Sequence, residues 1–308
     1  MRLGVLDIGS NTVHLLLVEA HHGAAPVATA SNKLELRLAE HVEDDGAIDA
    51  QGIELLVEFV AESVAFAEEE GVETLIAFAT SALREAPNGA KVLARLRRAA
   101  GVRVTVLSGE LEARTTFLAV RRWFGWSSGE LFVADIGGGS LELALGRDED
   151  PDSCLSVPLG AGRLTWQFAV AEDELDLKEM RKYVRAHLLD VADQLPERTN
   201  GRHFVATSKS FRQLARINGA ASSSAGPFVT RKLKRSDVVG MSQRLAELNV
   251  DERASLPGVS RGRALQLPAA AVVAEAVMEI FDIDTFELCP WALREGLILR
   301  YLDAMPLG

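Results

Sequence analysis

The chain has 308 residues, of which 48% are hydrophobic and 25% charged, and its formal net charge is −11. This length predicts about two domains of ~150 residues. The acidic balance does not favour non-specific binding to nucleic acid or anionic membranes. Cys154 and Cys289 match no C-x-x-C spacing, which argues against a zinc site or a disulfide framework. Because no signal peptide or membrane-spanning run is found, we expect a cytoplasmic protein without nucleic-acid or membrane partners.

The first part of the chain is predicted to alternate strands and helices. Two strands, 3–6 and 13–18, flank the polar turn 7–12. Then follow a helix over 49–71, a strand over 74–79, a helix over about 88–100, a strand over 102–107 and a helix to about 124. The small, flexible residues of 125–129 mark the best candidate for a domain boundary.

The remainder repeats this alternation. The predicted strands are 131–135, 141–145, 203–206 and 285–288, and the predicted helices are about 175–195, 210–217, 236–248, 263–281 and 291–302. The basic run 231–235 is expected in a loop before a helix capped by Ser236, as a solvated segment or as a landing strip for a polyanion. The whole pattern predicts an α/β protein.

A weak internal repeat relates the two halves. Aligning Asp7 with Asp135 also pairs Gly9 with Gly137, about one domain length apart. The repeat indicates a duplicated α/β unit with one hairpin turn in each half. We expect domains at 1–125 and 126–308 with a cleft between them, and the last helix, about 291–303, to be able to pack back on the first domain.

The two hairpin turns are candidate phosphate-binding loops. A Gly-rich turn lets several backbone N–H groups converge on an anion, and nearby hydroxyl and amide groups add donors. The candidate residues are Gly9, Ser10, Asn11, Thr12, Gly137, Gly138, Gly139 and Ser140. Asp7 and Asp135, at the end of the preceding strands, are candidate Mg²⁺ ligands. The alternative is a pair of ordinary turns in which Asp-x-Gly only satisfies the backbone.

Two further segments place charged groups at strand ends. Arg84 follows the strand 74–79, where it can grip phosphate oxygens or simply pair with a neighbouring acid. Glu112 lies in the first turns of the helix after strand 102–107. A carboxylate directed into a phosphate site would repel the substrate, so its presence there requires a catalytic function. Orienting and deprotonating an attacking water is the purpose that we assign to it.

Five ordered motifs together resemble the exopolyphosphatase / guanosine pentaphosphate phosphatase family. They are DIGSNT at 7–12, ATSALR at 79–84, SGELEA at 108–113, DIGGGSLE at 135–142 and ALREG at 292–296. The resemblance covers nearly the whole chain and implies two duplicated actin-like domains of the ribonuclease H-like type. It also implies that Glu112 is the catalytic base, that Asp135 and Glu142 hold Mg²⁺, and that Arg84 and the two loops grip phosphate.

The chain departs from the family pattern in two places. Ser208-Lys209-Ser210 stands where the family often has Ser-Gly-Thr, so we expect Ser208 and Lys209 to bind phosphate by side chain as well as by backbone. Longer relatives also carry additional C-terminal helical domains, and this chain ends at Gly308 without them.

The resulting hypothesis is an exopolyphosphatase, a phosphoric anhydride hydrolase that releases terminal orthophosphate from inorganic polyphosphate. The alternatives are a guanosine pentaphosphate 5′-phosphohydrolase, an ATP-dependent kinase of the same fold and a non-catalytic polyphosphate or alarmone sensor. The expected cofactor is Mg²⁺, with Mn²⁺ as the substitute. A symmetric homodimer is implied by the resemblance alone.

Overall fold

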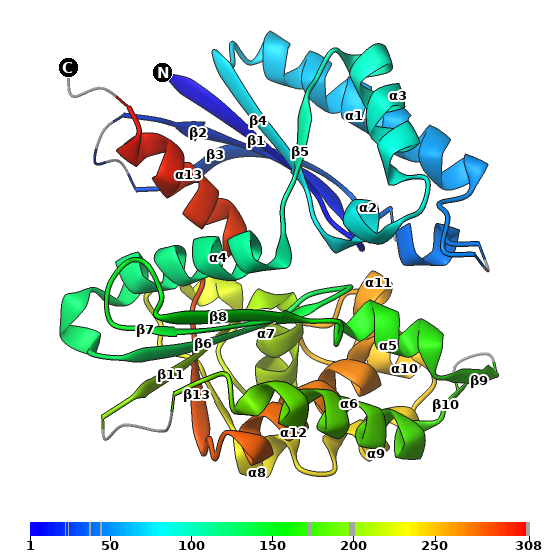
Figure 1. Ribbon diagram of the computed structural model, residues 1–308, viewed down its shortest axis with the longest axis vertical. Helices are drawn as coiled ribbons and strands as arrows, with labels where there is room; N and C mark the ends of the chain where they lie inside the picture. The colour runs from blue at the N-terminus through cyan, green and yellow to red at the C-terminus, as the bar shows by residue number, and fades with distance from the viewer. Residues whose placement is uncertain are drawn as a thin grey trace. The chain divides into compact units, whose positions relative to one another are not determined.

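Two β-sheets, one in each of two units, form the framework of the chain in the computed structural model (Figure 1). The structure describes residues 1–305 except 22, 24, 37, 44, 172–173 and 197–200. The first unit comprises Met1–Glu112 with Leu293–Gly308, and the second comprises Ala113–Ala292. The division therefore falls after Glu112, inside helix α4 (Gly109–Phe124), earlier than the boundary expected at 125–126.

The first unit holds a five-stranded sheet in the order β3-β2-β1-β4-β5. Its strands are β1 (Arg2–Ile8), β2 (Val13–Glu19), β3 (Ala28–Leu34), β4 (Thr74–Ala79) and β5 (Val104–Val106). β1 pairs antiparallel with β2 and parallel with β4, and β4 pairs parallel with β5. The carboxyl ends of β1, β4 and β5 thus share one edge, where open α/β sheets place their ligands.

Helices cover both faces of this sheet because side chains alternate along each strand. Helices α1 (Ala50–Glu69) and α3 (Gly89–Ala100) pack on the face that carries Leu6 and Ile8. Helix α13 (Leu293–Asp303) packs on the other face, against Leu3 and Val5. Two short helices, η1 (Leu38–His41) and α2 (Ser81–Glu85), complete this part of the fold.

The second unit repeats this topology. Its sheet has the order β12-β13-β11-β6-β7-β8. The strands are β6 (Leu131–Ile136), β7 (Leu141–Gly146), β8 (Ser153–Val157), β11 (His203–Thr207), β12 (Lys232–Lys234) and β13 (Thr285–Leu288). β6 pairs antiparallel with β7 and parallel with β11, so five strands reproduce the order of the first sheet and β12 is an addition at one edge. The duplicated α/β unit predicted from the alignment is confirmed.

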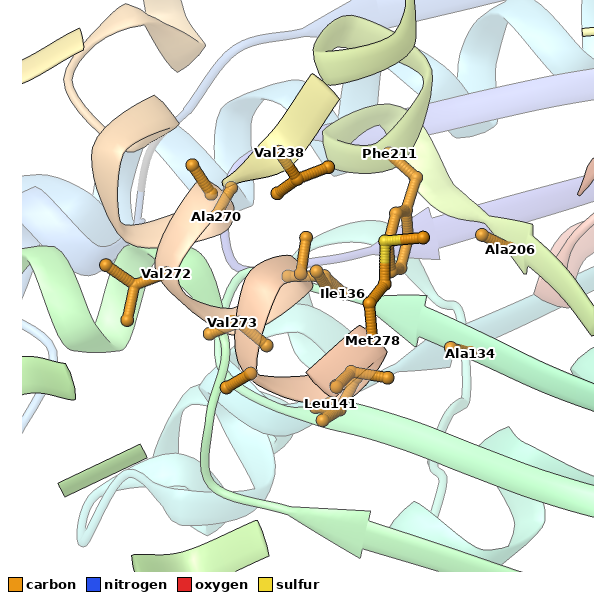
Figure 2. Packing of buried hydrophobic residues seen from close by; sticks show 14 of the residues in the cluster. Ala134, Ile136, Leu141, Ala206, Phe211, Val238, Ala270, Val272, Val273 and Met278 are labelled. Carbon is orange, nitrogen blue, oxygen red and sulfur yellow. The ribbon is translucent and has the colours of Figure 1, made fainter. Parts of the chain in front are cut away.

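The core of the second unit lies on one face of this sheet. Helix α12 (Leu267–Ile280) is buried along almost its whole length and packs with α6 (Leu177–Ala192) and α7 (Ser208–Ile217). Figure 2 shows its Val273 and Met278 beside Ile136 and Leu141, which end β6 and begin β7. Both stems of the hairpin turn 137–140 are therefore anchored in the core. The residues of α4 after Glu112 cover the opposite face.

Short elements connect these layers. They are η2 (Trp126–Ser128), α5 (Ala161–Gln167), β9 (Ala169–Ala171), β10 (Glu174–Leu175), η3 (Ser223–Ala225), α8 (Arg235–Val238), α9 (Met241–Ala246), α10 (Val250–Ser255) and α11 (Arg261–Ala264). No helix among the described residues has the length and apolar character needed to cross a bilayer.

Two local predictions were wrong. The helix expected over 236–248 is divided into α8 and α9 because Gly240 adopts a left-handed φ of 67°. The basic run is not a loop before a Ser236 cap: it forms edge strand β12 and the start of α8 at Arg235. Arg231 donates to four backbone carbonyls, and Arg235 pairs with Asp282 and Asp284. Exposed lysines on an edge strand also oppose pairing with another chain.

Candidate active site

The first hairpin turn lies at the carboxyl edge of the first sheet. Gly9 N–H donates to Thr12 O at 3.0 Å, which closes the turn 9–12 on itself. The hydroxyls of Ser10 and Ser81 are 3.1 Å apart, so the turn is also tied to the start of α2. Asn11 is buried. The two segments that the sequence placed at neighbouring strand ends are thus in contact.

The second hairpin turn has the same construction. Gly137 N–H donates to Ser140 O at 2.9 Å, as Gly9 does to Thr12. The strand registers also match, because Asp7 lies opposite His14 and Asp135 lies opposite Glu142. The repeat read from the sequence is therefore a repeat of backbone geometry. The residue facing the aspartate is where the two copies differ.

In the first copy the aspartate faces a cation and a neutral imidazole. Arg294 Nε lies 3.7 Å from Asp7 Oδ2, and its guanidinium also donates to Nδ1 of His14. Burial raises the pKa of Asp7 to about 6, the Arg294 charge opposes this rise, and Glu295 adds to it. Burial and the charges of Arg294 and Lys33 lower the pKa of His14 to about 4. His14 is therefore neutral at pH 7 and accepts the hydrogen bond from Arg294.

In the second copy the aspartate faces another acid. Asp135 and Glu142 are cross-strand neighbours, and Glu142 is only 6% exposed. Ser156, on β8, donates to Glu142 Oε1 at 2.9 Å. Two carboxylates and a hydroxyl form an oxygen-rich site of negative charge, the donor set that hard divalent cations select.

Arg84 and Glu112 form a buried ion pair in the first unit. Arg84 Nη1 donates both to the carboxylate of Glu112 and to Leu107 O, the latter at 2.9 Å. The Glu112 side chain is 8% exposed and that of Arg84 is 24% exposed. The structure thus brings the two predicted catalytic residues together. The guanidinium fixes the direction of the carboxylate, which a group that accepts a proton from water requires.

The Ser208–Lys209 segment lies at the equivalent edge of the second sheet. Thr207, the last residue of β11, is in register with Asp135. Ser208 has a left-handed φ of 83°, a strained conformation that functional sites often hold in place. Lys209 Nζ donates to Ser260 at 2.9 Å, and Ser210 Oγ donates to Ile136 O at 3.0 Å, next to the turn 137–140.

Sequence reasoning missed the residues that support the second turn. Ala161 and Arg163, at the start of α5, donate to the carbonyls of that turn, and Gly160 lies directly against it. The repeated glycines at 160 and 162 were the signal for a close approach of two backbones. Ser156 was also missed, because strand β8 was not predicted. The contacts of Arg294 with Asp7 and His14 were missed as well.

The donor groups also limit the kind of metal site. No cluster of three or more His, Cys, Asp or Glu side chains is arranged to hold a metal anywhere in the described ranges. A cation on Asp135 and Glu142 would need further oxygen ligands from water and from the substrate. Mg²⁺ is commonly bound in this way, through one or two carboxylates plus phosphate oxygens. The residues present therefore fit Mg²⁺ and do not fit a closed, all-protein site.

Known proteins are similar to this chain in both sequence and fold. The family model described as the Ppx/GppA phosphatase family matches residues 17–305. Exopolyphosphatase 1 of Mycobacterium tuberculosis is 48% identical over 306 residues, covering 99% of this chain and 89% of that protein. Exopolyphosphatase 1 of Mycobacterium leprae is 47% identical, covering 99% and 90%.

Solved structures agree with this likeness. A crystal structure of an exopolyphosphatase from Cytophaga hutchinsonii has a TM-score of 0.85 at 22% identity and covers 100% of both chains. The Aquifex aeolicus member of the Ppx/GppA family has a TM-score of 0.79 at 23% identity and covers 99% of both chains. The predicted actin-like α/β fold is confirmed. The chain belongs to the Ppx/GppA phosphatase family.

Proposed function

We propose that this protein is an exopolyphosphatase that removes the terminal phosphate from inorganic polyphosphate. The observation that carries the proposal is the buried Arg84–Glu112 pair, which provides a fixed carboxylate base in a chain with two phosphate-loop turns. The mycobacterial relatives that cover 99% of this chain are named exopolyphosphatase 1. Both the chemistry and the likeness therefore favour hydrolysis of a phosphoric anhydride.

The proposed reaction is a single displacement by water. Glu112 accepts a proton from the attacking water, whose oxygen forms a bond to the terminal phosphorus. The bond from that phosphorus to the bridging oxygen breaks, which releases orthophosphate and leaves a chain shorter by one phosphate. The protein supplies positioning and hydrogen bonds rather than covalent chemistry, as phosphoryl transfer generally requires. Arg84 has the task of holding the base in place.

The phosphate-binding residues are assigned by the kind of donor that they offer. Gly9 to Thr12 offer backbone N–H groups together with hydroxyl and amide side chains, whereas Gly137 to Ser140 offer mainly backbone N–H groups. Ser208 and Lys209 are assigned to the same role at the neighbouring strand end. These assignments are predictions, and single substitutions that weaken substrate binding more than folding would support them.

The proposed metal ligands are Asp135 and Glu142. Bound there, Mg²⁺ or Mn²⁺ would neutralise charge on the phosphate oxygens. Asp7 was the third candidate, but the nearby Arg294 guanidinium already offsets part of the charge of its carboxylate. We therefore rank Asp7 below the other two as a ligand. A cytoplasmic location is part of the proposal, and so is a homodimer, the latter on the family resemblance alone.

One assay separates the proposal from its alternatives. Phosphate release is measured with Mg²⁺ on short polyphosphate, long polyphosphate, guanosine pentaphosphate and ATP at matched concentrations. We expect the highest kcat/KM on a polyphosphate. A higher kcat/KM on guanosine pentaphosphate would indicate that this nucleotide, and not polyphosphate, is the substrate. Formation of ADP from ATP that depends on an added alcohol would indicate a kinase. Tight binding of all four without turnover would indicate a sensor and overturn the proposal.

A further inference from the structure

The phosphate turn 137–140 is held from one side by the start of helix α5. Ala161 N–H donates to Gly137 O at 3.0 Å, and Arg163 N–H donates to Gly138 O at 2.9 Å. The third carbonyl, that of Gly139, accepts from the side-chain Nε of Arg163 at 2.9 Å. Three successive carbonyls of the turn therefore have donors from a single short segment, and two of these donors belong to Arg163.

The contact is close because the facing residue is glycine. A Cβ at Gly160 would lie 2.3 Å from the carbonyl carbon of Gly139 and 2.4 Å from the nitrogen of Ser140. The segment is itself anchored, since Leu159 and Leu164 on either side of it are fully buried. The start of α5 is thus a rigid support against which the turn rests.

The fixed carbonyls determine where the N–H groups of the turn point. The C=O and N–H bonds of a peptide group point in opposite directions, so holding the oxygens on one side directs the N–H bonds to the other side. Such an array of N–H groups forms a concavity for anions. None of the hydrogen bonds in the described chain starts from the N–H groups of residues 138–140. Three consecutive glycines would otherwise sample many peptide orientations. Holding them in one orientation lowers the entropic cost of binding phosphate.

We propose that Arg163 is a positioning residue of the active site, whose side chain holds the Gly139 carbonyl so that the turn 137–140 is preorganised for the terminal phosphate. This inference rests on the proposed function and extends it to a residue outside the family motifs. The essential feature is the Nε–H bond rather than the positive charge. Lysine, which retains the charge but has no donor at that position, is therefore predicted to be a poor replacement.

The test compares Arg163→Met and Arg163→Lys with the parent protein and with Arg185→Met. Arg185 pairs with Glu279 on the exposed side of α6 and has no contact with the turn, so its substitution controls for loss of an arginine. We expect both Arg163 variants to lower kcat/KM on tripolyphosphate by roughly 10- to 100-fold, the effect of one hydrogen bond to a charged site. Arg185→Met should retain the parent value, and thermal unfolding checks that each variant is folded.

A second readout measures binding without turnover. In the Glu112→Gln background, tripolyphosphate affinity is measured by calorimetry, and protection of the 137–140 amides by hydrogen exchange. We expect bound tripolyphosphate to protect these amides in the Glu112→Gln protein. Arg163→Met and Arg163→Lys should weaken affinity by a similar factor and reduce the protection that the bound tripolyphosphate gives. If Arg163→Met does not fold, the comparison of Arg163→Lys with the parent decides.

Failure of the proposed function and failure of the positioning role of Arg163 would give different results. A parent protein that neither binds nor hydrolyses polyphosphate would refute the proposed function. An active parent together with parent-like affinity and kcat/KM in Arg163→Lys would refute the positioning role, because charge alone would then suffice. Equal losses in the Arg163 variants and in Arg185→Met would also refute it.

Discussion

Replacing Glu112 by glutamine tests the base assignment because it changes proton affinity while keeping the shape of the side chain. The amide oxygen of Gln can still accept the hydrogen bond from Arg84, which also keeps its bond to Leu107 O. Loss of a general base lowers kcat by about 10² to 10⁴, which is about 3–5 kcal/mol in the barrier.

The folding cost of the same change should be smaller. A hydrogen bond to a charged group contributes about 1–2 kcal/mol more than a neutral one, and the 24% exposure of Arg84 reduces that difference. We therefore expect the free energy of unfolding to fall by about 1 kcal/mol, well below the rise in the barrier. The excess of the kinetic effect over the folding effect is the signature of a catalytic role.

The assay combines phosphate release from polyphosphate, urea unfolding and calorimetric binding of tripolyphosphate. Glu110→Gln is the matched control, since Glu110 lies in the same helical turn but is exposed. We expect Glu112→Gln to bind substrate without turnover and Glu110→Gln to behave like the parent. A folded Glu112→Gln protein with more than about one tenth of the parent activity would refute the reasoning, because a general base supplies at least 10².

Three other predictions follow from individual contacts. The pKa of Asp7 is raised from 3.8 to about 6, so the parent protein loses stability as the pH rises between these values. This loss is roughly 2–3 kcal/mol in the free energy of unfolding. Asp7→Asn should not show it when urea unfolding is compared at pH 4 and pH 7. Identical pH profiles would refute this. Glu142→Gln should raise the Mg²⁺ concentration for half-maximal activity by about tenfold or more, since ligand changes typically cost that much; an unchanged Mg²⁺ titration would exclude Glu142 as a ligand. Gly160→Ala should lower the free energy of unfolding by about 1–3 kcal/mol and reduce kcat/KM, because its Cβ would meet the Gly139 backbone; parent-like values in unfolding and kinetic assays would contradict the close contact.

The sequence predicted the elements whose patterns are local. The two Asp-x-Gly hairpins were found because apolar strands on both sides and the turn residues lie within a dozen positions of each other. Edge strands β3 and β8 were missed because they are short or mostly polar, with little buried surface to produce an alternating pattern. Only pairing with a neighbouring strand stabilises such segments, and that pairing is not visible in their own residues.

The same distinction applies to the active site. Glu112 and Arg84 could be proposed from motifs, but their ion pair depends on two segments 28 residues apart in the chain. Arg163 reaches Gly139 across 24 residues, and the neighbouring glycines at 160 and 162 signal a close approach but not the partner of the arginine. The residues assigned to substrate binding left a signal in the sequence. The residues that hold them in place left a signal only where glycines marked a close approach of two backbones.

The two hairpins share a backbone geometry but differ in the residue that lies opposite the aspartate. Both turns close with the same hydrogen bond, and both place an aspartate opposite a residue of the next strand. In the first copy that residue is His14, which shares Arg294 with the aspartate, so a cation already lies beside this carboxylate. In the second copy it is Glu142, so two acidic residues are cross-strand neighbours, and Ser156 on β8 donates to Glu142.

Electrostatics makes these copies unequal as metal sites. Two adjacent carboxylates are destabilised by mutual repulsion unless a cation binds, whereas a carboxylate beside an arginine gains little from a further cation. The second hairpin should therefore bind a divalent cation with the substrate, and the first should bind phosphate through its hydroxyl and amide donors. We therefore expect the identity of the cross-strand partner, rather than the repeated turn itself, to determine which role each copy takes.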